Sequence, residues 1–237
     1  MSERDVIFPR DDAADVRSFY LQENFRALLD ATARPGELAL LSISDDEAFS
    51  CAARAGLLPQ TVCVLDVVLD AGTTVRVAGA QSDDATRELG ERTHALARPL
   101  EEAAFCVVPL ALAGEDAATA VRAVRSGTLA SPHLGATCVV ECTVLMGTDA
   151  SGVRIGSRTE STKHVRWTLV GPGIDGTCEL ECDRDDVLAA RNARVDEFPL
   201  GVDLVLVDGA GHIACVPRST RLTRMGISGE EVRSWAM

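Results

Sequence analysis

The chain has 237 residues, of which 36 are acidic and 23 basic, giving a net charge of -13. That length suits one large or two small domains and allows most of the apolar surface to be buried. Strong acidity argues against general nucleic-acid binding, which needs a basic face. The longest apolar run, residues 103–113, is too short to cross a bilayer, and the charged amino terminus lacks the apolar core of a secretory signal. We therefore expect a cytoplasmic protein.

The first half of the chain alternates helical and extended patterns. Apolar residues recur at helical spacing from residue 12 until Pro35-Gly36 ends the helix. Ser82, followed by two acids, resembles the N-cap of a helix that runs to about residue 96. The other expected elements are a short strand or extended arm at 38–43, a helix at 47–58, a further apolar segment through residue 69 after a break at Pro59, strands at 73–77 and 104–108, and a helix at 117–125.

The second half is richer in strand patterns. A single β-rich run at residues 137–145 is expected to form a hairpin with 153–157. A strand at 166–170 follows, and Asp183 is expected to cap a helix at 184–193. Residues 198–220 supply the last two strands, and a loop begins at Gly226.

Helices that alternate with strands early, and hairpins that cluster late, predict an α/β fold. We expect a single three-layer domain with a mixed β-sheet flanked by helices, spanning residues 12–225. Residues 1–11 and 226–237 are expected to be flexible termini.

Eight cysteines, most of them within apolar runs, are interpreted as buried free thiols of the core. Two pairs, Cys138/Cys142 and Cys178/Cys182, have a spacing that zinc sites also use. Because Cys138 and Cys142 fall in a strand-like run, they are expected on one face of the sheet. Core packing is the preferred interpretation, and no metal site is expected.

The segment from Phe198 to Thr220 carries the main candidate site. Its last strand ends at Pro217 and is followed by Arg218, Ser219 and Thr220, whose guanidinium and hydroxyl groups suit a phosphate or phosphonate. Such groups at the edge of a sheet lie where α/β folds place ligands. Asp203 interrupts an apolar strand and needs a partner. An Asp203–Arg218 structural pair and a ligand-binding role are both open.

Two further candidates lie in turns and at a helix end. Gly171 and Gly173 flank Pro172 after a strand, so their backbone either cradles a phosphate or simply forms a tight turn. Arg34 precedes the Pro-Gly helix stop, where it either favours the helix dipole or joins Arg26 on one helix face to meet a phosphate. No nucleophile elbow, HEXXH motif or P-loop occurs, and the catalytic residues stay unassigned.

Several blocks, taken in order, resemble one family. They are Asn24–Ala31 with Ala33-Arg34-Pro35-Gly36, then Gly127-Thr128 with Ser131-Pro132 and Gly135-Ala136-Thr137, then Leu169–Ile174, and finally Phe198–Leu204 with Ile213–Thr220. The set is similar to the H subunit (PhnH type) of the bacterial carbon–phosphorus lyase core complex. The block Phe-Pro-Leu-Gly-Val-Asp, followed by the Pro-Arg-Ser-Thr ending, is its most specific part.

The resemblance implies a fold similar to the large domain of pyridoxal-phosphate-dependent transferases, without that cofactor. It implies a homodimer that joins the G, I and J subunits. The complex attaches a ribose triphosphate to an alkylphosphonate, displacing adenine from ATP, so this chain is expected to be a subunit of a transferase that forms α-D-ribose 1-alkylphosphonate 5-triphosphate. No independent activity is expected.

Two alternatives stay open. The chain is either a contributor of anion-binding groups or a non-catalytic dimeric scaffold that positions the other subunits. An independent pyridoxal enzyme needs a Schiff-base lysine, and Lys163, in a polar loop, is the only lysine of the chain. We therefore expect no cofactor.

Overall fold

The computed structural model describes residues 12–43, 46–80, 82–159 and 161–227. Of the predicted flexible termini 1–11 and 226–237, residues 1–11 and 228–237 lie outside the described residues, and residues 226–227 belong to the last strand. Within them, the chain forms α1 (Asp12–Ala33), β1 (Leu38–Leu40), α2 (Asp46–Ala55), α3 (Pro59–Val68), β2 (Thr74–Val77), α4 (Asp83–Thr93), β3 (Leu96–Ala97), β4 (Phe105–Val108), α5 (Glu115–Ala123), β5 (Thr137–Cys142), β6 (Leu145–Thr148), β7 (Arg154–Ser157), β8 (Val165–Val170), β9 (Cys178–Cys182), α6 (Asp185–Asn192), β10 (Asp203–Asp208), β11 (His212–Val216) and β12 (Arg221–Ile227).

The central feature is a seven-stranded mixed sheet with the order β1-β11-β10-β5-β4-β2-β3. Every pair from β10 to β3 is parallel, whereas β11 runs antiparallel to both β10 and β1. The predicted mixed sheet is therefore confirmed. The parallel strands follow from the βα alternation in the first half of the chain, since a parallel pair needs a crossover connection.

A second sheet, where only one mixed sheet was expected, has five strands in the order β12-β8-β9-β6-β7. All its pairs are antiparallel. The run at residues 137–145, predicted as one strand, is divided between the two sheets as β5 and β6. The expected hairpin partner, β7, therefore pairs only with β6. Strands β9 and β12 were not predicted, and β12 continues through Gly226 and Ile227, where a loop was expected.

The break between β5 and β6 has a local cause. The backbone N–H groups of Thr143 and Val144 both donate to Asp183 Oδ1 at 3.1 Å, so they are not available to a continuous ladder. The Asp183 side chain therefore binds the β5–β6 connection and does not cap α6. Arg184 occupies the N-cap position and makes no side-chain cap, so the predicted Asp183 cap is wrong.

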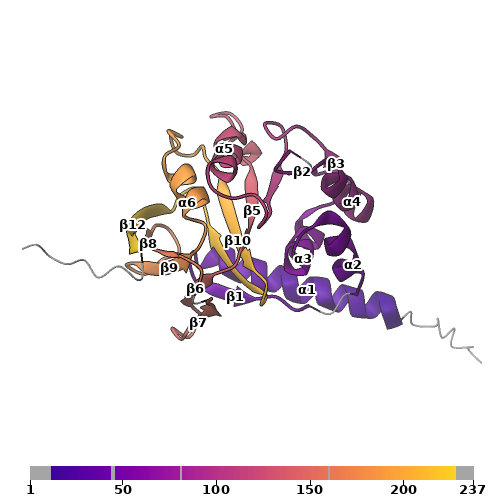
Figure 1. Ribbon diagram of the computed structural model, residues 1–237, viewed down its shortest axis with the longest axis horizontal. Helices are drawn as coiled ribbons and strands as arrows, with labels where there is room; N and C mark the ends of the chain where they lie inside the picture. Colours follow the sequence, from indigo (N-terminus) through magenta and orange to yellow (C-terminus); the bar gives the residue numbers. More distant parts are fainter. Residues whose placement is uncertain (1–11, 44–45, 81, 160, 228–237) are drawn as a thin grey trace, which may run out of the picture.

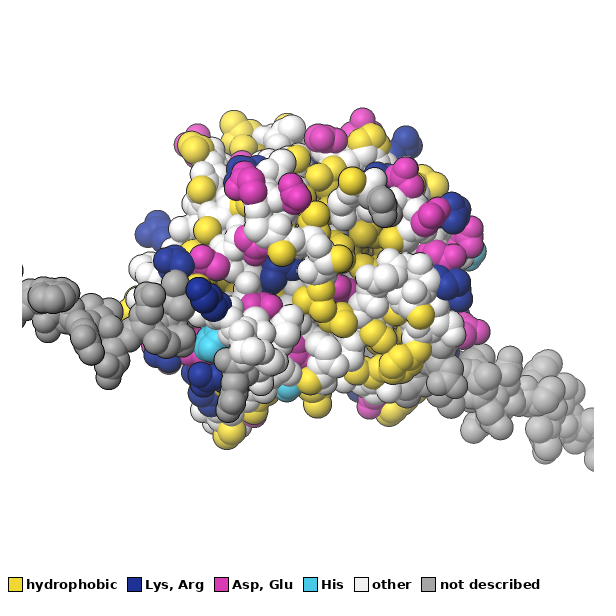
Figure 2. All heavy atoms as spheres, in the orientation of Figure 1, with side chains coloured by type: hydrophobic (Ala, Val, Ile, Leu, Met, Phe, Trp, Pro, Cys, Tyr) yellow, Lys and Arg dark blue, Asp and Glu magenta, His cyan; other side chains and the backbone are white. Residues whose placement is uncertain are grey.

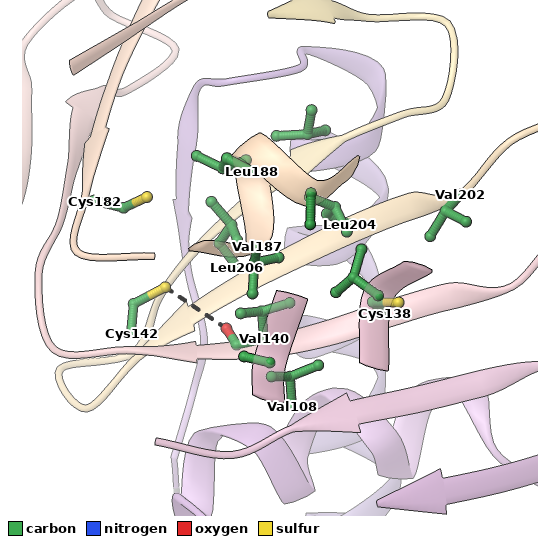
Figure 3. Packing of buried hydrophobic residues seen from close by; sticks show 14 of the residues in the cluster. Val108, Cys138, Val140, Cys142, Cys182, Val187, Leu188, Val202, Leu204 and Leu206 are labelled. Carbon is green, nitrogen blue, oxygen red and sulfur yellow. Dashed lines mark hydrogen bonds between the residues drawn. The ribbon is translucent and has the colours of Figure 1, made fainter. Parts of the chain in front are cut away.

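Helices cover both faces of the large sheet (Figure 1). Helices α1 to α4 pack on one face against alternate residues such as Val107, Val139 and Val205. Helices α5 and α6, together with the second sheet, pack on the other face. Figure 3 shows Val187 and Leu188 of α6 over Leu204 and Leu206 of β10, beside Val140. The period-2 alternation of the strands thus divides the apolar core into two layers.

The cysteines belong to this core. Seven of the eight are buried, and all are free thiols. Cys138 and Cys142 lie in the same apolar cluster with Cys182, as expected for one face of a strand (Figure 3). Burial raises the pKa of Cys182 to about 12 and that of Cys215 to about 11, so both thiols stay protonated near neutral pH. The core interpretation is confirmed.

Two boundaries differ from the prediction around α4. The Ser82 hydroxyl donates to the Gly79 carbonyl oxygen at 2.8 Å and makes no side-chain cap, although Ser82 holds the N-cap position. The helix ends at Thr93 because His94 adopts a left-handed φ of 64° and the next residues form β3. Among the described residues, no single helix is long and apolar enough to span a membrane; only the pair α2–α3, bent by 108°, passes that test together.

Candidate functional site: an arginine pocket at the amino edge of the sheet

The segment Pro217–Thr220 lies at the amino edge of the large sheet. Asp203, the first residue of β10, sits beside Thr137, the first residue of β5, and antiparallel β11 ends opposite Leu204. The predicted anion-binding groups therefore lie at the amino ends of the parallel strands. Open α/β sheets bind ligands beyond the carboxyl ends, so the general rule used to place this site does not apply to it.

Asp203 and Arg218 form an ion pair across this edge. The Arg218 backbone N–H donates to Asp203 Oδ1 at 2.6 Å, and Nε donates to both carboxylate oxygens at 3.1 Å. Nη2 also donates to Oδ2, and Nη1 donates to the Pro132 carbonyl oxygen at 2.6 Å. These bonds engage the guanidinium with acceptors of the protein itself. The geometry therefore favours a structural ion pair over a role in which Arg218 alone binds a ligand.

Two glycines make room for Arg218. A Cβ added to Gly201, which has a φ of 139°, would lie 3.0 Å from Arg218 Cβ. A Cβ added to Gly135 would lie 2.5 Å from the Gly201 carbonyl oxygen and would overlap Arg218 Nη1. Glycine at both positions is thus explained by the close approach of two loops to one guanidinium.

The Gly171–Ile174 segment is a tight turn. The Ile174 N–H donates to the Gly171 carbonyl oxygen at 3.2 Å, and Gly173 has the positive φ of 83° that the third position of a type II turn requires. A Cβ on Gly173 would lie 2.6 Å from the Ala33 carbonyl oxygen, and one on Gly171 would lie 3.1 Å from Thr220 Cα. The turn therefore packs against the end of α1 and the Pro217–Thr220 segment.

Arg26 of α1 and Arg34, the first residue after the end of α1, both line an open groove of about 760 Å³. Glu23 and Asp30 line the same groove. Arg34 pairs with Asp30 at 3.3 Å and with Glu37 at 3.0 Å. The charge of this groove is mixed, and it shares no lining residue with the pocket beside Arg218.

That pocket, which we call the arginine pocket, has a volume of about 190 Å³. Four arginines line it: Arg191 in the last turn of α6, Arg194 just after that helix, and Arg218 and Arg221 from either side of Thr220. Ser219, in the same turn, is partly exposed, whereas Thr220 is buried. Of the residues that the sequence singled out, Arg218 and Thr220 line this pocket, whereas the lining residues Arg191 and Arg194 were not among the candidates.

Charge within the arginine pocket is incompletely balanced. Arg194 pairs with Asp196 at 2.6 Å, and Arg218 pairs with Asp203. Among the described residues, neither Arg191 nor exposed Arg221 has an ion pair. Two guanidinium groups therefore lack a direct ion-pair partner among the described residues, within a chain whose net charge is -13.

Arg191 is the more buried of these two arginines. It donates to the carbonyl oxygens of Thr220 at 2.7 Å and Pro217 at 2.6 Å. Burial lowers its pKa, and the nearby carboxylates of Asp203 and Asp196 oppose that change. Thr220 Oγ1 is buried without a hydrogen-bond partner in the described structure. An anion held here would meet a partly desolvated cation, which is the setting in which charge-assisted hydrogen bonds are strongest.

One sequence signal pointed to the missed residues. Arg191 and Arg194 follow the acidic first turn of α6 and precede Asp196. That spacing is equally typical of cations that stabilise a helix C-terminus, so only the tertiary contact with Pro217 and Thr220 identifies Arg191 as part of a pocket. No three His, Cys, Asp or Glu side chains of the described residues are grouped so that they could hold a metal ion.

The family model for the bacterial phosphonate metabolism protein PhnH matches residues 15–223 of the chain. No curated protein matches the chain. The matched range includes all of the residues that line the arginine pocket.

Proposed function

Because the chain belongs to the PhnH family of bacterial phosphonate metabolism proteins, we propose that it is a subunit of the carbon–phosphorus lyase system. In this role it contributes to the formation of α-D-ribose 1-alkylphosphonate 5-triphosphate from ATP and an alkylphosphonate. In that reaction the bond from the ribose to adenine breaks and a bond from the ribose to a phosphonate oxygen forms. Both reactants and the product are polyanions, so a subunit that serves them needs cationic groups that the protein itself does not neutralise.

The observation that carries the proposal is the excess of positive charge in the arginine pocket. Arg191 and Arg221 provide guanidinium groups that match phosphonate or phosphate oxygens. The volume of about 190 Å³ is below the range of about 300–1,000 Å³ that is usual for drug-sized ligands. The pocket therefore suits a single phosphonate or phosphate group, with the rest of the molecule outside it. We assign it a binding role and no chemical step.

The test is calorimetric titration of the purified chain with methylphosphonate and with inorganic triphosphate. Loss of one charge-assisted hydrogen bond is worth about 1.5–3 kcal/mol, so Arg221→Ala is expected to weaken binding by roughly 10- to 100-fold. Arg98→Ala is the matched control, because Arg98 is also exposed and lies just beyond the carboxyl end of β3, away from the arginine pocket. Absence of saturable binding to the wild-type chain, or equal effects of the two substitutions, would exclude the pocket as the site.

We also propose that the fold is related to the large domain of pyridoxal-phosphate-dependent transferases and that the chain works without that cofactor. The seven-stranded mixed sheet with helices on both faces supports the first part. The position of Lys163 supports the second, because it is exposed in the segment before β8, whereas Schiff-base lysines are activated by desolvation or a neighbouring cation.

A second candidate function is a dimeric scaffold that positions the G, I and J subunits. Exposed apolar side chains favour it: Phe25 and Leu29, one turn apart on α1, are each 55% exposed. A helix whose apolar residues face solvent is typical of a protein contact. The two functions are compatible, since a scaffold subunit can also contribute a binding pocket.

A further inference from the structure

A second pocket lies near the same edge of the large sheet, between the sheet and helices α1 and α3. Its volume is about 340 Å³. Leu28 and Thr32 of α1 and Val64 and Val68 of α3 form one wall, and residues of β4, β5, β10 and β11 form the other. We call it the α1–α3 pocket. It shares no lining residue with the arginine pocket.

The sheet wall is built by strand register. Phe105, Thr137 and Asp203 lie side by side on three neighbouring parallel strands. Val139 and Val205, two residues further along β5 and β10, pair with each other and point to the same face. The result is an apolar wall with two polar residues and one aromatic residue at its end, which is the usual composition of a small-molecule site.

Both polar groups retain hydrogen-bonding capacity. The Asp203 carboxylate has about four acceptor positions, and three N–H groups of Arg218 reach it. The Nε–H is shared between both oxygens, so a fourth donor has room on one of them. The Thr137 hydroxyl makes no hydrogen bond to another described residue. Since neighbouring strands are about 4.8 Å apart, one ligand edge can reach both groups.

The charge of the pocket restricts its ligand. Arg218 already balances Asp203, and the remaining walls are mostly aliphatic, so an ion inside the pocket would lose its hydration without gaining a counter-ion. We propose that the α1–α3 pocket binds a small neutral molecule with an apolar body and an N–H or O–H donor, which donates to Asp203. This inference goes beyond the phosphonate role and does not depend on it.

The experiment compares indole with indene, which has the same shape without the N–H group. Thermal unfolding of the full chain is followed over a series of concentrations of each probe. Indole is expected to raise the Tm in a saturable way, because a ligand of the native state stabilises it, and indene is expected to bind at least fivefold more weakly. No saturable shift with indole, or an equal shift with indene, overturns the proposal.

Matched variants test whether indole binds in the α1–α3 pocket. Val139→Phe and Val64→Phe fill the pocket from its two walls, so each is expected to abolish the indole shift. Val140→Ala is the control: it alters the next residue of β5, which points to the opposite face and packs in the cluster of Figure 3. Its Tm is expected to be lower, with the indole shift retained. Indole binding that survives in both filled variants contradicts the assignment.

The two sites are also separable. Arg221→Ala is expected to leave the indole shift unchanged, and Val139→Phe is expected to leave methylphosphonate binding unchanged. Failure of one assignment therefore does not imply failure of the other.

Discussion

At the scale of single residues, the Asp203–Arg218 pair shows how a motif that resembles a ligand site acts as a structural clamp. Arg218 joins the start of β10 to the loop at Pro132 through one guanidinium, and Gly135 and Gly201 keep the space that it occupies. The side chains of Arg218 and Asp203 are only 17% and 30% exposed, so the pair is partly shielded from water.

This predicts a large difference between two arginines of one pocket. Arg218→Ala leaves the Asp203 carboxylate without its cation and is expected to lower the free energy of unfolding by about 2–4 kcal/mol. Arg221→Ala, which removes an exposed side chain, is expected to change it by less than about 0.5 kcal/mol. Urea unfolding of both variants checks the prediction. Equal midpoints would instead indicate that the pair contributes little to folding and would favour its ligand role.

At the scale of elements, a buried carboxylate organises the β10–β11 hairpin. Asp208 Oδ1 accepts hydrogen bonds from the N–H groups of Ala210 and His212, each at 2.9 Å, and Oδ2 lies 2.8 Å from His212 Nδ1. Desolvation by burial alone would raise the pKa of Asp208, but the hydrogen bonds from His212 and Ser157 outweigh it and hold the pKa below its ordinary value of 3.8.

The sign of the pH dependence follows from that lowered pKa. A carboxyl group whose pKa is lower in the native state than in the unfolded state stabilises the fold at pH values above its unfolded-state pKa. This contribution is lost as the pH falls through the native-state pKa. The wild-type chain is expected to lose stability below about pH 3.8, and Asp208→Asn is expected to lose less over that window. Thermal unfolding of both chains between roughly pH 2 and pH 5, the range in which this carboxyl group titrates, checks the prediction.

Asp149 provides the matched comparison at the turn of the β6–β7 hairpin. Its Oδ1 also accepts hydrogen bonds from its own turn, namely from the backbone N–H groups of Ser151 and Val153, each at 2.9 Å. The hydrogen bond from the Ser151 hydroxyl and these backbone bonds together lower the pKa of Asp149. The side chain is more exposed than that of Asp208, so Asp149→Asn is expected to change the loss of stability at low pH far less than Asp208→Asn does. A larger effect at Asp149 than at Asp208 would contradict the role given to burial.

At the scale of the whole molecule, acidic and basic side chains are interspersed over the face in Figure 2, with apolar side chains between them. The exposed apolar residues of α1 are the feature that bears on assembly. A surface helix with Phe25 and Leu29 facing solvent is expected to be covered in a homodimer or by a partner subunit.

The assembly prediction is tested by sedimentation and by co-purification with the G, I and J subunits. The double variant Phe25→Asp/Leu29→Asp is expected to be monomeric or to lose a partner, because a carboxylate in an apolar contact would be desolvated without a counter-ion. Phe49→Asp is the control, since Phe49 is similarly exposed, at 47%, but lies on α2. A wild-type chain that sediments as a monomer and purifies alone would exclude the scaffold role.

Features that depend on local chemistry could be predicted from the amino-acid sequence. Apolar spacing located α1, Pro35-Gly36 ended it, and the Gly171-Pro172-Gly173 turn followed from the residues that its backbone requires. Alternating apolar strands predicted a mixed sheet between helices, and the thiols were correctly assigned to the core. The ordered motifs identified the family without any tertiary information.

The way in which distant segments meet could not be predicted from the sequence, because it depends on tertiary contacts. Asp183 captures the N–H groups that divide β5 from β6, so one apolar run serves two sheets. Antiparallel β11 carries Arg218 to the amino edge, and α6 brings Arg191 to the same turn. Both outcomes depend on strand direction and on contacts across tens of residues, whereas sequence patterns report only on neighbours within a turn or a strand. Arg218 was a candidate from the sequence, but its grouping with Arg191, Arg194 and Arg221 in one pocket depends on the fold.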